Sequence, residues 1–301
     1  MKKIGIVGGV GWRSTVEYYS EICRRTDAWH AEKKLSGAPS IPEIVIESLD
    51  LAKAFALLGK DEKEESWRSF DAYHRGALWR LETAGADVAL LASNTPHHRF
   101  NEIVRGVGIP VISILDAAAE ECRRAGARKV LVLGTALAMR SGKFRAAFAT
   151  HGIELVPPVS DVARARTVTL IAELQRGRVK GAAVRMGKIV ASSWRFPGEP
   201  VVCLACTELP LAFPGFTNQA SFKYGGVTYI NTTAAHIDAV LQHVGIPPEK
   251  RSPARGRSGP GGKKEFSVMG AATAAAGAGS AATATGGAAT TAPVEATAAA
   301  R

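Results

Sequence analysis

Short runs of valine, isoleucine and leucine alternate along this chain with longer stretches of helical spacing, and this alternation restricts the possible folds more than any other feature. The strand-length runs stand at residues 3–7, 43–46, 88–92, 111–114, 129–133 and 200–205. The helix-length stretches stand at residues 14–25, 60–84, 116–124, 141–150, 161–176 and 233–244. Continuous apolar strands that alternate with helices are typical of a parallel sheet covered by helices. The sequence therefore predicts an α/β protein.

A glycine-rich turn follows the first apolar run. Residues 8–11 read Gly-Gly-Val-Gly, and Glu17 stands three positions after Ser14, a capping-box spacing that predicts a helix with Ser14 at its N-cap. The dinucleotide-binding pattern G-x-G-x-x-G fails, because its third glycine would fall on Ser14. We interpret the turn as a site where backbone N–H groups and the helix N-terminus bind a carboxylate. The alternative is a turn that only lets the helix pack on the strand.

Composition excludes several classes of protein. The 301 residues are 46% hydrophobic and 22% charged, which excludes a fibrous or wholly disordered chain. The net charge is +11, but the basic residues are spread along the chain and match no nucleic-acid-binding motif, so we expect no nucleic-acid partner. No apolar run has the length of a membrane span or a signal-peptide core, which predicts no membrane partner and a cytoplasmic protein. Residues 246–301 are rich in Ala, Gly, Thr and Pro, and we expect this tail to be disordered.

The chain contains four cysteines, Cys23, Cys122, Cys203 and Cys206. A cytoplasmic location predicts free thiols. Because the Cys203 and Cys206 pair lacks the further ligands of a structural zinc site, we expect no metal. Side chains three positions apart in a strand point to opposite faces, which predicts that Cys203 is a small buried hydrophobe. Cys206 ends the strand before Thr207 and Glu208, and is therefore the candidate for a reactive thiol.

Two apolar runs end in similar polar chemistry. One leads into Ser93 and the other leads into Cys206. Ligands of open α/β sheets bind beyond the carboxyl ends of strands, so we expect these two residues to face one substrate across a cleft. For the polar segment 93–98, an asparagine and proline turn with a helix cap is the alternative. A Ser-His-Asp hydrolase is disfavoured, because no G-x-S-x-G elbow surrounds Ser93.

Four segments, in matching order and spacing, resemble the aspartate/glutamate racemase family. They are residues 8–15 with Tyr18 and Tyr19, residues 93–97, residues 133–135 and residues 206–211. The resemblance implies two similar doubly wound parallel-sheet α/β domains with the active site in the cleft between them. It also implies PLP-independent amino-acid chemistry without any cofactor, and a homodimer. On this basis we expect a first domain of residues 1–115 plus 212–245 and a second of residues 116–211.

The resemblance further implies an acid/base pair on the two faces of the substrate Cα. The family usually has one cysteine before Asn-Thr and another in a Cys-Thr-Glu motif, and these positions are Ser93 and Cys206 here. One branch, which also carries Trp in its glycine-rich turn, has threonine at the first position. In three further departures, Arg13 replaces that branch's acidic residue, Ala205 replaces a glycine and Asn231 replaces an aspartate.

The serine at position 93 leaves the reaction open. Racemisation at Cα needs a base on one face and an acid on the other. A thiol can play either part, whereas the Ser93 hydroxyl needs a neighbour such as His97 or His98 to take its proton. Three alternatives follow: an asymmetric racemase or epimerase that is faster from one enantiomer, a single-cysteine decarboxylase or isomerase, and a non-catalytic binding protein for an amino acid or dicarboxylate.

The same positions predict how the substrate binds. We expect its carboxylate to lie against the Gly11 and Trp12 N–H groups and four polar side chains, those of Asn94, Thr95, Thr135 and Thr207. Glu208 and His97 are expected to support the catalytic pair. Relatives specific for acidic substrates use a basic residue after the second strand, and the candidates for that role here are Arg13, Lys53 and Arg185.

Overall fold

The first four apolar runs form one parallel sheet. The computed structural model describes residues 1–34, 36–38, 41–60 and 63–248. The strands of this sheet are β1 (Ile4–Gly8), β2 (Ile44–Ser48), β3 (Val88–Leu91) and β4 (Val111–Ile112). They lie in the order β2-β1-β3-β4, and each pairing is parallel. The predicted α/β class is confirmed.

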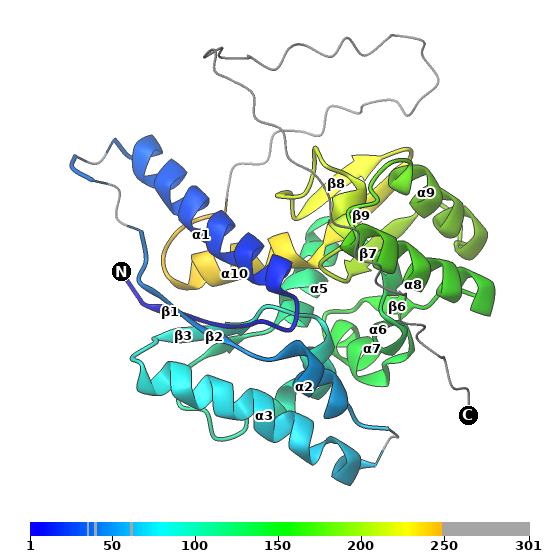
Figure 1. The fold of residues 1–301 in the computed structure, drawn as a ribbon. Coiled ribbons are helices and arrows are strands. Elements are labelled where there is room, and N and C mark those ends of the chain that lie inside the picture. Colours follow the sequence, from blue (N-terminus) through cyan, green and yellow to red (C-terminus); the bar gives the residue numbers. More distant parts are fainter. Residues whose placement is uncertain (35, 39–40, 61–62, 249–301) are drawn as a thin grey trace, which may run out of the picture. The chain divides into compact units, whose positions relative to one another are not determined.

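Helices cover both faces of the first sheet. They are α1 (Trp12–Glu32), α2 (Leu51–Ala56), α3 (Glu64–Thr83), α4 (Phe100–Ile103) and α10 (Thr232–His243). Alternation along β1 sends Ile4 and Ile6 to the core under α1 and α10, and Val7 to the core under α3. Figure 1 shows α1 and α10 on one side of the sheet and α3 on the other.

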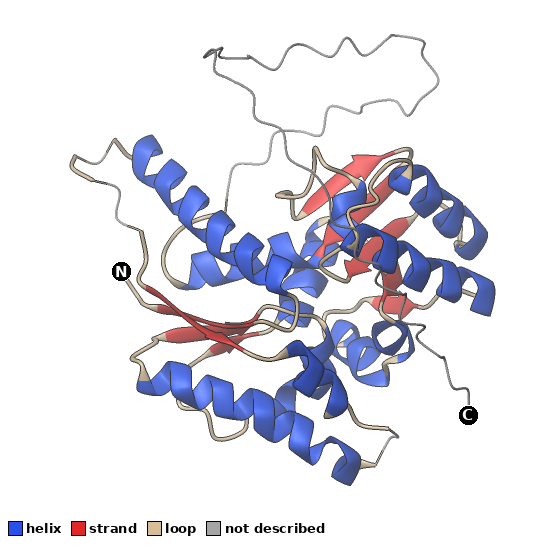
Figure 2. Ribbon diagram, in the orientation of Figure 1, coloured by secondary structure: helices blue, strands red, loops and turns tan. Residues whose placement is uncertain are grey.

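A second sheet follows in the chain, and Figure 2 shows its strands as a separate group. The strands are β5 (Lys129–Gly134), β6 (Glu154–Val156), β7 (Val201–Ala205), β8 (Ser221–Tyr224) and β9 (Val227–Asn231). Their order is β6-β5-β7-β9-β8, with β8 antiparallel to β9 and the other pairs parallel. Two parallel-sheet halves are thus present, as predicted.

Helices also cover both faces of the second sheet. They are α5 (Ile114–Arg124), α6 (Ala136–Arg140), α7 (Gly142–Ala149), α8 (Asp161–Gln175) and α9 (Ala182–Ser193). Cys203 faces the core formed with α5 and α7, and it is fully buried there as predicted. Leu204 faces the core formed with α8 and α9. Helix α10 packs against α5 and thereby joins the two halves.

The predicted boundary between the two halves is wrong for residues 221–231. They were expected with the first domain, but β9 pairs with β7 from Val201↔Thr228 to Leu204↔Asn231 and so belongs to the second sheet. Gly225 and Gly226 form the turn between β8 and β9, both with positive φ. A Gly-Gly pair between two short strands is a hairpin signal, and it identifies this segment once the strands are recognised.

Helix α1 begins earlier than the capping-box spacing predicts. Its N-cap is Gly11, and no side chain among the described residues caps it. The predicted N-cap, Ser14, lies within the first turn, and its hydroxyl donates to Thr207 Oγ1 at 2.6 Å. The N-cap prediction is therefore wrong, because a tertiary hydrogen bond takes the side chain that the local pattern assigned to capping.

The end of α10 corrects the start of the predicted tail. Gly245 has φ +89°, and the Ile246 N–H donates to the Leu241 carbonyl, which is the Schellman arrangement. Ile246 is 2% exposed and packs in the core of the first sheet, so the folded part includes it. The rest of the predicted tail from residue 249 lies outside the described residues. Among the described helices, none combines the length and apolar character that crossing a membrane requires.

Candidate active site

A cavity of about 290 Å³ lies where strands of both sheets end. The turn after β1, the segment after β3, Thr135 after β5 and the segment after β7 all contribute to it. Every residue predicted as catalytic or as a contact of the substrate carboxylate lines this cavity, together with Glu208. The complete lining is Val10, Gly11, Trp12, Arg13, Ser14, Leu51, Phe55, Ser93, Asn94, Thr95, Thr135, Gln175, Ala205, Cys206, Thr207 and Glu208. We call it the strand-end cavity.

One chain of hydrogen bonds joins the end of β3 to β7. Asn94 Nδ2 donates to Thr232 Oγ1 at 3.2 Å, and Thr232 Oγ1 donates to the Leu204 carbonyl at 2.9 Å. All three groups are buried, so these bonds are shielded from water. They tie the segment that carries Ser93 to the strand that carries Cys206.

A second set of bonds joins the start of α1 to the other half of the cavity. The Ser14 hydroxyl bond to Thr207 reaches the segment after β7. Arg13 Nη1 donates to the Gln175 carbonyl at the end of α8, at 2.6 Å. The first turn of α1 is therefore held over the cavity from the second sheet.

Two glycines allow the strand ends to approach one another. Gly9 has φ +85°, and a Cβ there would stand 2.1 Å from the Leu49 carbonyl oxygen. A Cβ on Gly134 would stand 2.6 Å from the Ala205 carbonyl oxygen, in the strand next to it. Any side chain at either position would push apart elements that line the cavity.

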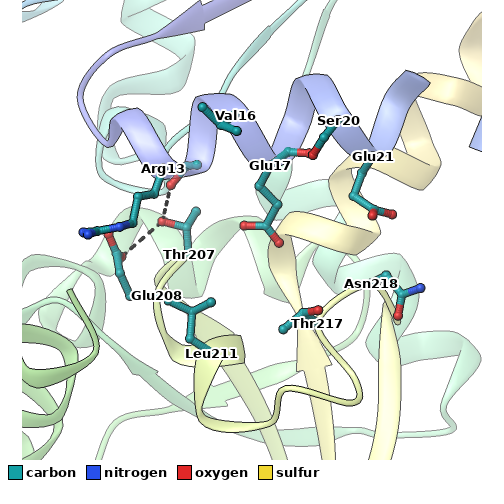
Figure 3. Close-up of a pocket in the computed structure, with 11 residues that line it drawn as sticks. Arg13, Val16, Glu17, Ser20, Glu21, Thr207, Glu208, Leu211, Thr217 and Asn218 are labelled. Carbon is teal, nitrogen blue, oxygen red and sulfur yellow. Dashed lines mark hydrogen bonds between the residues drawn. The ribbon is translucent and has the colours of Figure 1, made fainter. Parts of the chain in front are cut away.

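The Cys206 thiol is bound to a carboxylate. Its Sγ donates to Glu208 Oε2 at 2.9 Å, and the Thr207 hydroxyl donates to the same oxygen at 3.1 Å. Gln175 Nε2 holds the other oxygen at 3.3 Å. Figure 3 shows the bond from Thr207 to Glu208. Burial, and then the Glu208 charge, raise the pKa of the Cys206 thiol well above its usual value, so the group is a protonated acid at neutral pH.

Ser93 has no comparable partner. Its side chain is half-buried, and its hydroxyl makes no hydrogen bond to any described residue. His97 reaches only the backbone of Ser93: its Nδ1 donates to the Ser93 carbonyl at 2.8 Å, while its Nε2 accepts from the Ile114 N–H at 3.1 Å. Both ring nitrogens are thus occupied by backbone groups.

The two histidines after Ser93 do not lie in the strand-end cavity. Burial, and then the neighbouring His236, hold the pKa of His97 well below its usual range, so this ring is neutral. His98 Nδ1 bonds to the Ser141 hydroxyl at 2.8 Å, under the start of α7. The hypothesis that either ring takes the Ser93 proton therefore has no support in the geometry.

Asn94 carries an unpaired acceptor at the cavity. The Thr232 hydroxyl donates its one proton to the Leu204 carbonyl, so towards Asn94 it can only accept a hydrogen bond. The Asn94 atom that faces Thr232 must therefore be the donor Nδ2. The buried Oδ1 then has no hydrogen-bond partner among the described residues. A buried acceptor without a partner is unfavourable, and a donor brought by a ligand would relieve that cost.

Donors for a carboxylate are also present. No side chain of the described residues caps the first turn of α1. The N–H groups of this turn, which begins at Gly11 and Trp12, can therefore donate to a ligand. Thr135 Oγ1 accepts from the Ala138 N–H as the N-cap of α6, and its own proton stays free to donate. Among the described residues, no group of three or more His, Cys, Asp or Glu side chains is arranged to hold a metal ion.

Of the three basic candidates, only Arg13 lines the cavity. The Lys53 ammonium lies 4.8 Å from the Tyr73 ring centre, and Arg185 pairs with Glu173 at 3.2 Å. Sequence reasoning missed Leu51, Phe55 and Gln175 in the lining. Asp50 caps α2 directly after β2, and an Asp after a strand is a signal that could have revealed the helix carrying Leu51 and Phe55.

Known proteins are similar to this chain in sequence and fold. Residues 7–240 match the model of the Asp/Glu/hydantoin racemases. A candidate Asp/Glu racemase from Yersinia pestis is 26% identical, with 81% of this chain and 99% of that chain covered and a TM-score of 0.63. An aspartate racemase homologue from Pyrococcus horikoshii is 29% identical, with the same coverage and a TM-score of 0.60. An aspartate racemase from Picrophilus torridus, 20% identical over 83% of this chain and 96% of its own, has a TM-score of 0.60 and supports the fold alone. The chain belongs to the Asp/Glu/hydantoin racemase family.

Proposed function

We propose that this protein is a cofactor-independent amino-acid racemase or epimerase that exchanges the proton on the substrate Cα. The observation that carries the proposal is one cavity lined by Ser93 and by a Cys206 thiol bonded to the Glu208 carboxylate. Cys206 and Ser93 would act on opposite faces of Cα. Family membership supports the same reaction class.

The substrate would be held by the groups that lack protein partners. Its carboxylate would accept from the first-turn N–H groups of α1 and from the Thr135 hydroxyl. Its ammonium would donate to Asn94 Oδ1. Thr207, whose hydroxyl already lies between Ser14 and Glu208, would position Glu208 rather than bind substrate. These contacts would fix Cα between the two catalytic side chains.

Glu208 supplies the proton acceptor that Cys206 needs. For Cys206 to act as base, its thiol proton moves to Glu208, and the thiolate then takes the Cα proton while the electron pair stays on the substrate. Ser93 delivers a proton to the opposite face, water restores the Ser93 proton, and Glu208 releases the proton it had taken to solvent. In the opposite sense, Ser93 would have to lose its proton first, and no described side chain is placed to take it.

The difference between Cys206, which has a proton acceptor, and Ser93, which has none, affects the rate of Cα–H exchange more than the rate of inversion. The two enantiomers have equal free energies in water, so kcat/KM for inversion is the same in both directions. The enantiomer whose Cα–H faces Cys206 nevertheless exchanges its proton with solvent when Ser93 does not act and the proton on the Cys206 sulfur is replaced from solvent before it returns to Cα. We therefore expect exchange with retention for that enantiomer, faster than inversion.

Proton exchange in D2O, followed by NMR, tests the proposal. Separate L- and D-amino acids are incubated with the protein, and loss of the Cα–H signal is compared with the appearance of the other enantiomer. Cys206→Ala should abolish both, and Ser93→Ala should abolish inversion but leave exchange of one enantiomer. Cys23→Ala, which removes a thiol outside the cavity, is the matched control. Exchange that persists in Cys206→Ala would exclude the proposed chemistry.

A second candidate is a lyase in which the Cys206 thiol alone protonates an enolate formed by decarboxylation. It is favoured by the protonated state of Cys206 and the unassisted Ser93 hydroxyl. Release of carbon dioxide from a substituted malonate, with no exchange of any amino acid, would identify it. A ligand that raises Tm without turnover would instead point to a binding protein.

A further inference from the structure

Three exposed apolar side chains, together called the apolar wall here, line the strand-end cavity. Trp12, the first residue of α1, contributes to it, as do Leu51 and Phe55 of α2. These side chains are 62%, 43% and 61% exposed, respectively. Single exposed apolar residues are ordinary, but three that line one cavity offer apolar surface that a ligand can bury.

The charged groups that line the cavity disfavour the binding of a second carboxylate. Arg13 and Glu208 are the charged residues among the described ones that line it. Gln175 holds both, because its carbonyl accepts from Arg13 and its amide donates to Glu208. The Arg13 guanidinium also lies 4.8 Å from the Trp12 ring centre. The positive and negative charges are therefore matched before substrate arrives.

Two further carboxyl groups line the surface next to the cavity, and one of them, Glu21, pairs with Arg24 and Arg25. A neighbouring cavity shares Arg13 and Glu208 with the strand-end cavity and is also lined by Glu17 and Glu21 (Figure 3). Burial, and then the charges of Glu21 and Glu208, raise the pKa of Glu17 to about 7. A substrate with a side-chain carboxylate would meet the Glu208 carboxylate beside Arg13, the one cation among the described residues that line the cavity.

We propose that the natural substrate carries a bulky apolar side chain, of the leucine or phenylalanine kind, and that Trp12, Leu51 and Phe55 determine this specificity. The proposal rests on the proposed function, since the same cavity must hold the α-carboxylate and α-ammonium. A zwitterion with a neutral side chain has no net charge, like the cavity itself. At about 290 Å³ the cavity is at the small end for ligand sites, which suits a single amino acid.

The side chain would be bound by burial alone. Contact with the exposed indole and phenyl faces removes apolar surface from water on both partners. Losing one such contact in a hydrophobic pocket changes kcat/KM by roughly 10-fold to 100-fold. A small side chain such as that of alanine does not reach the wall and should be indifferent to it.

Exchange of Cα–H in D2O is measured at low concentrations of L- and D-forms of leucine, phenylalanine, alanine, aspartate and glutamate. Leucine and phenylalanine should exchange at least about 10-fold faster than the two acidic amino acids. Phe55→Ala should slow the two apolar substrates by roughly 10-fold to 100-fold and change alanine little. Tyr19→Ala removes an exposed aromatic side chain of α1 outside the cavity lining, and should change none of them.

Three results would overturn the proposal while leaving a racemase intact: faster exchange of aspartate or glutamate, loss of that exchange in Arg13→Ala, or equal behaviour of Phe55→Ala and Tyr19→Ala. If no amino acid exchanges its Cα proton, the proposed function fails. Thermal unfolding with the same amino acids then tests separately which class of side chain the cavity binds. A rise in Tm with leucine or phenylalanine but not aspartate supports the apolar class. A rise with aspartate alone, or with none of them, excludes it.

Discussion

The two catalytic positions are alike in the fold and unlike in their surroundings. Ser93 and Cys206 both follow a buried parallel strand, and both line the strand-end cavity. Cys206 is 6% exposed, and its thiol, together with Thr207 and Gln175, donates to one carboxylate. The Ser93 hydroxyl has no such partner among the described residues. Equivalent backbone positions therefore do not give equivalent acids, because the neighbours decide where protons go.

The groups that contact Ser93 and Cys206 from the protein interior also differ. The Ser93 carbonyl is held by His97, a buried neutral ring, and His97 is packed against His236 with ring centres 5.7 Å apart. Behind Cys206 the controlling groups are a carboxylate and two hydroxyls. The Ser93 side consequently depends on two buried histidines that the fold holds neutral, whereas the Cys206 side depends on a carboxylate that accepts the thiol proton.

Glu208→Gln breaks the Cys206 side and has the largest expected effect. The amide keeps the size of the side chain and an acceptor oxygen, but it cannot take the thiol proton. We expect exchange to fall by roughly 100-fold to 1,000-fold, the usual contribution of a general base. Loss of the negative charge should also lower the pKa of Cys206, measured by the ultraviolet absorbance of the thiolate.

Glu173→Gln is the matched control for that variant, because Glu173 pairs with Arg185 away from the cavity. It should leave both the rate and the Cys206 titration unchanged. A Glu208→Gln protein with full activity, or with a raised Cys206 pKa, would contradict the role given to the carboxylate.

Acid should weaken the Ser93 side through its buried histidines. His236 Nε2 donates to the Ile112 carbonyl and its Nδ1 accepts from the Tyr18 hydroxyl, both at 2.8 Å, so the folded protein holds a neutral ring. Burial lowers the pKa of His236 from 6.5 to about 4. Between those values the unfolded chain binds a proton that the folded chain does not, so stability falls as pH falls from 6.5 towards 4, by up to about 3 kcal/mol.

Urea unfolding at a series of pH values measures this loss. His236→Gln removes the titrating ring and should flatten the dependence in that window, although it lowers stability at neutral pH. A slope that is unchanged in the variant would assign the acid sensitivity to other groups.

Sequence reasoning predicted the parts of the fold that local patterns determine. Continuous runs such as residues 88–92 and 129–133 are strands because both faces of each sheet are covered. The β8–β9 hairpin was missed because polar residues interrupt the apolar runs of both strands, and because β8 lies at the edge of the second sheet. Ser14 was misassigned because its hydroxyl bonds to Thr207 across the cleft. Local spacing contains no information about a partner that is distant in the chain.

In the candidate site, too, local sequence patterns predicted some residues and missed those whose partners are distant in the chain. Residues at strand ends, such as Asn94 and Thr135, were predictable because parallel strands present their carboxyl ends together. The groups that set their chemistry were not, because they arrive from other elements. Thr232 reaches Asn94 from α10, and Gln175 reaches Glu208 from the last residue of α8. Only the packing of the two halves brings them into contact.

Thr232→Val tests the link between the two sides. The substitution keeps the shape of the side chain but removes the hydroxyl that joins Asn94 to Leu204, which leaves a buried amide without its acceptor. We expect the free energy of unfolding to fall by about 1–3 kcal/mol, measured by urea denaturation. Exchange should slow as well, since Asn94 loses its orientation.

Thr233→Val provides a matched control in the next residue of α10. The Thr233 hydroxyl is buried and has no hydrogen-bond partner among the described residues, so its removal should leave stability unchanged or raise it. Equal losses of unfolding free energy in the two variants would mean that replacing a buried hydroxyl by a methyl group, rather than losing the bond to Asn94, determines the effect.

Ser93→Cys should make the two sides alike, and it has the smallest expected effect. A thiol loses its proton far more readily than a hydroxyl, so both faces of Cα would then carry a group able to act as acid or base. Inversion should rise by roughly 10-fold relative to exchange with retention, because the second face no longer limits the reaction. The new thiol would still lack a carboxylate partner, so it should titrate at a lower pH than Cys206. If inversion does not rise, the Ser93 face is limited by position rather than by acidity, and the contrast between the two sides lies in geometry.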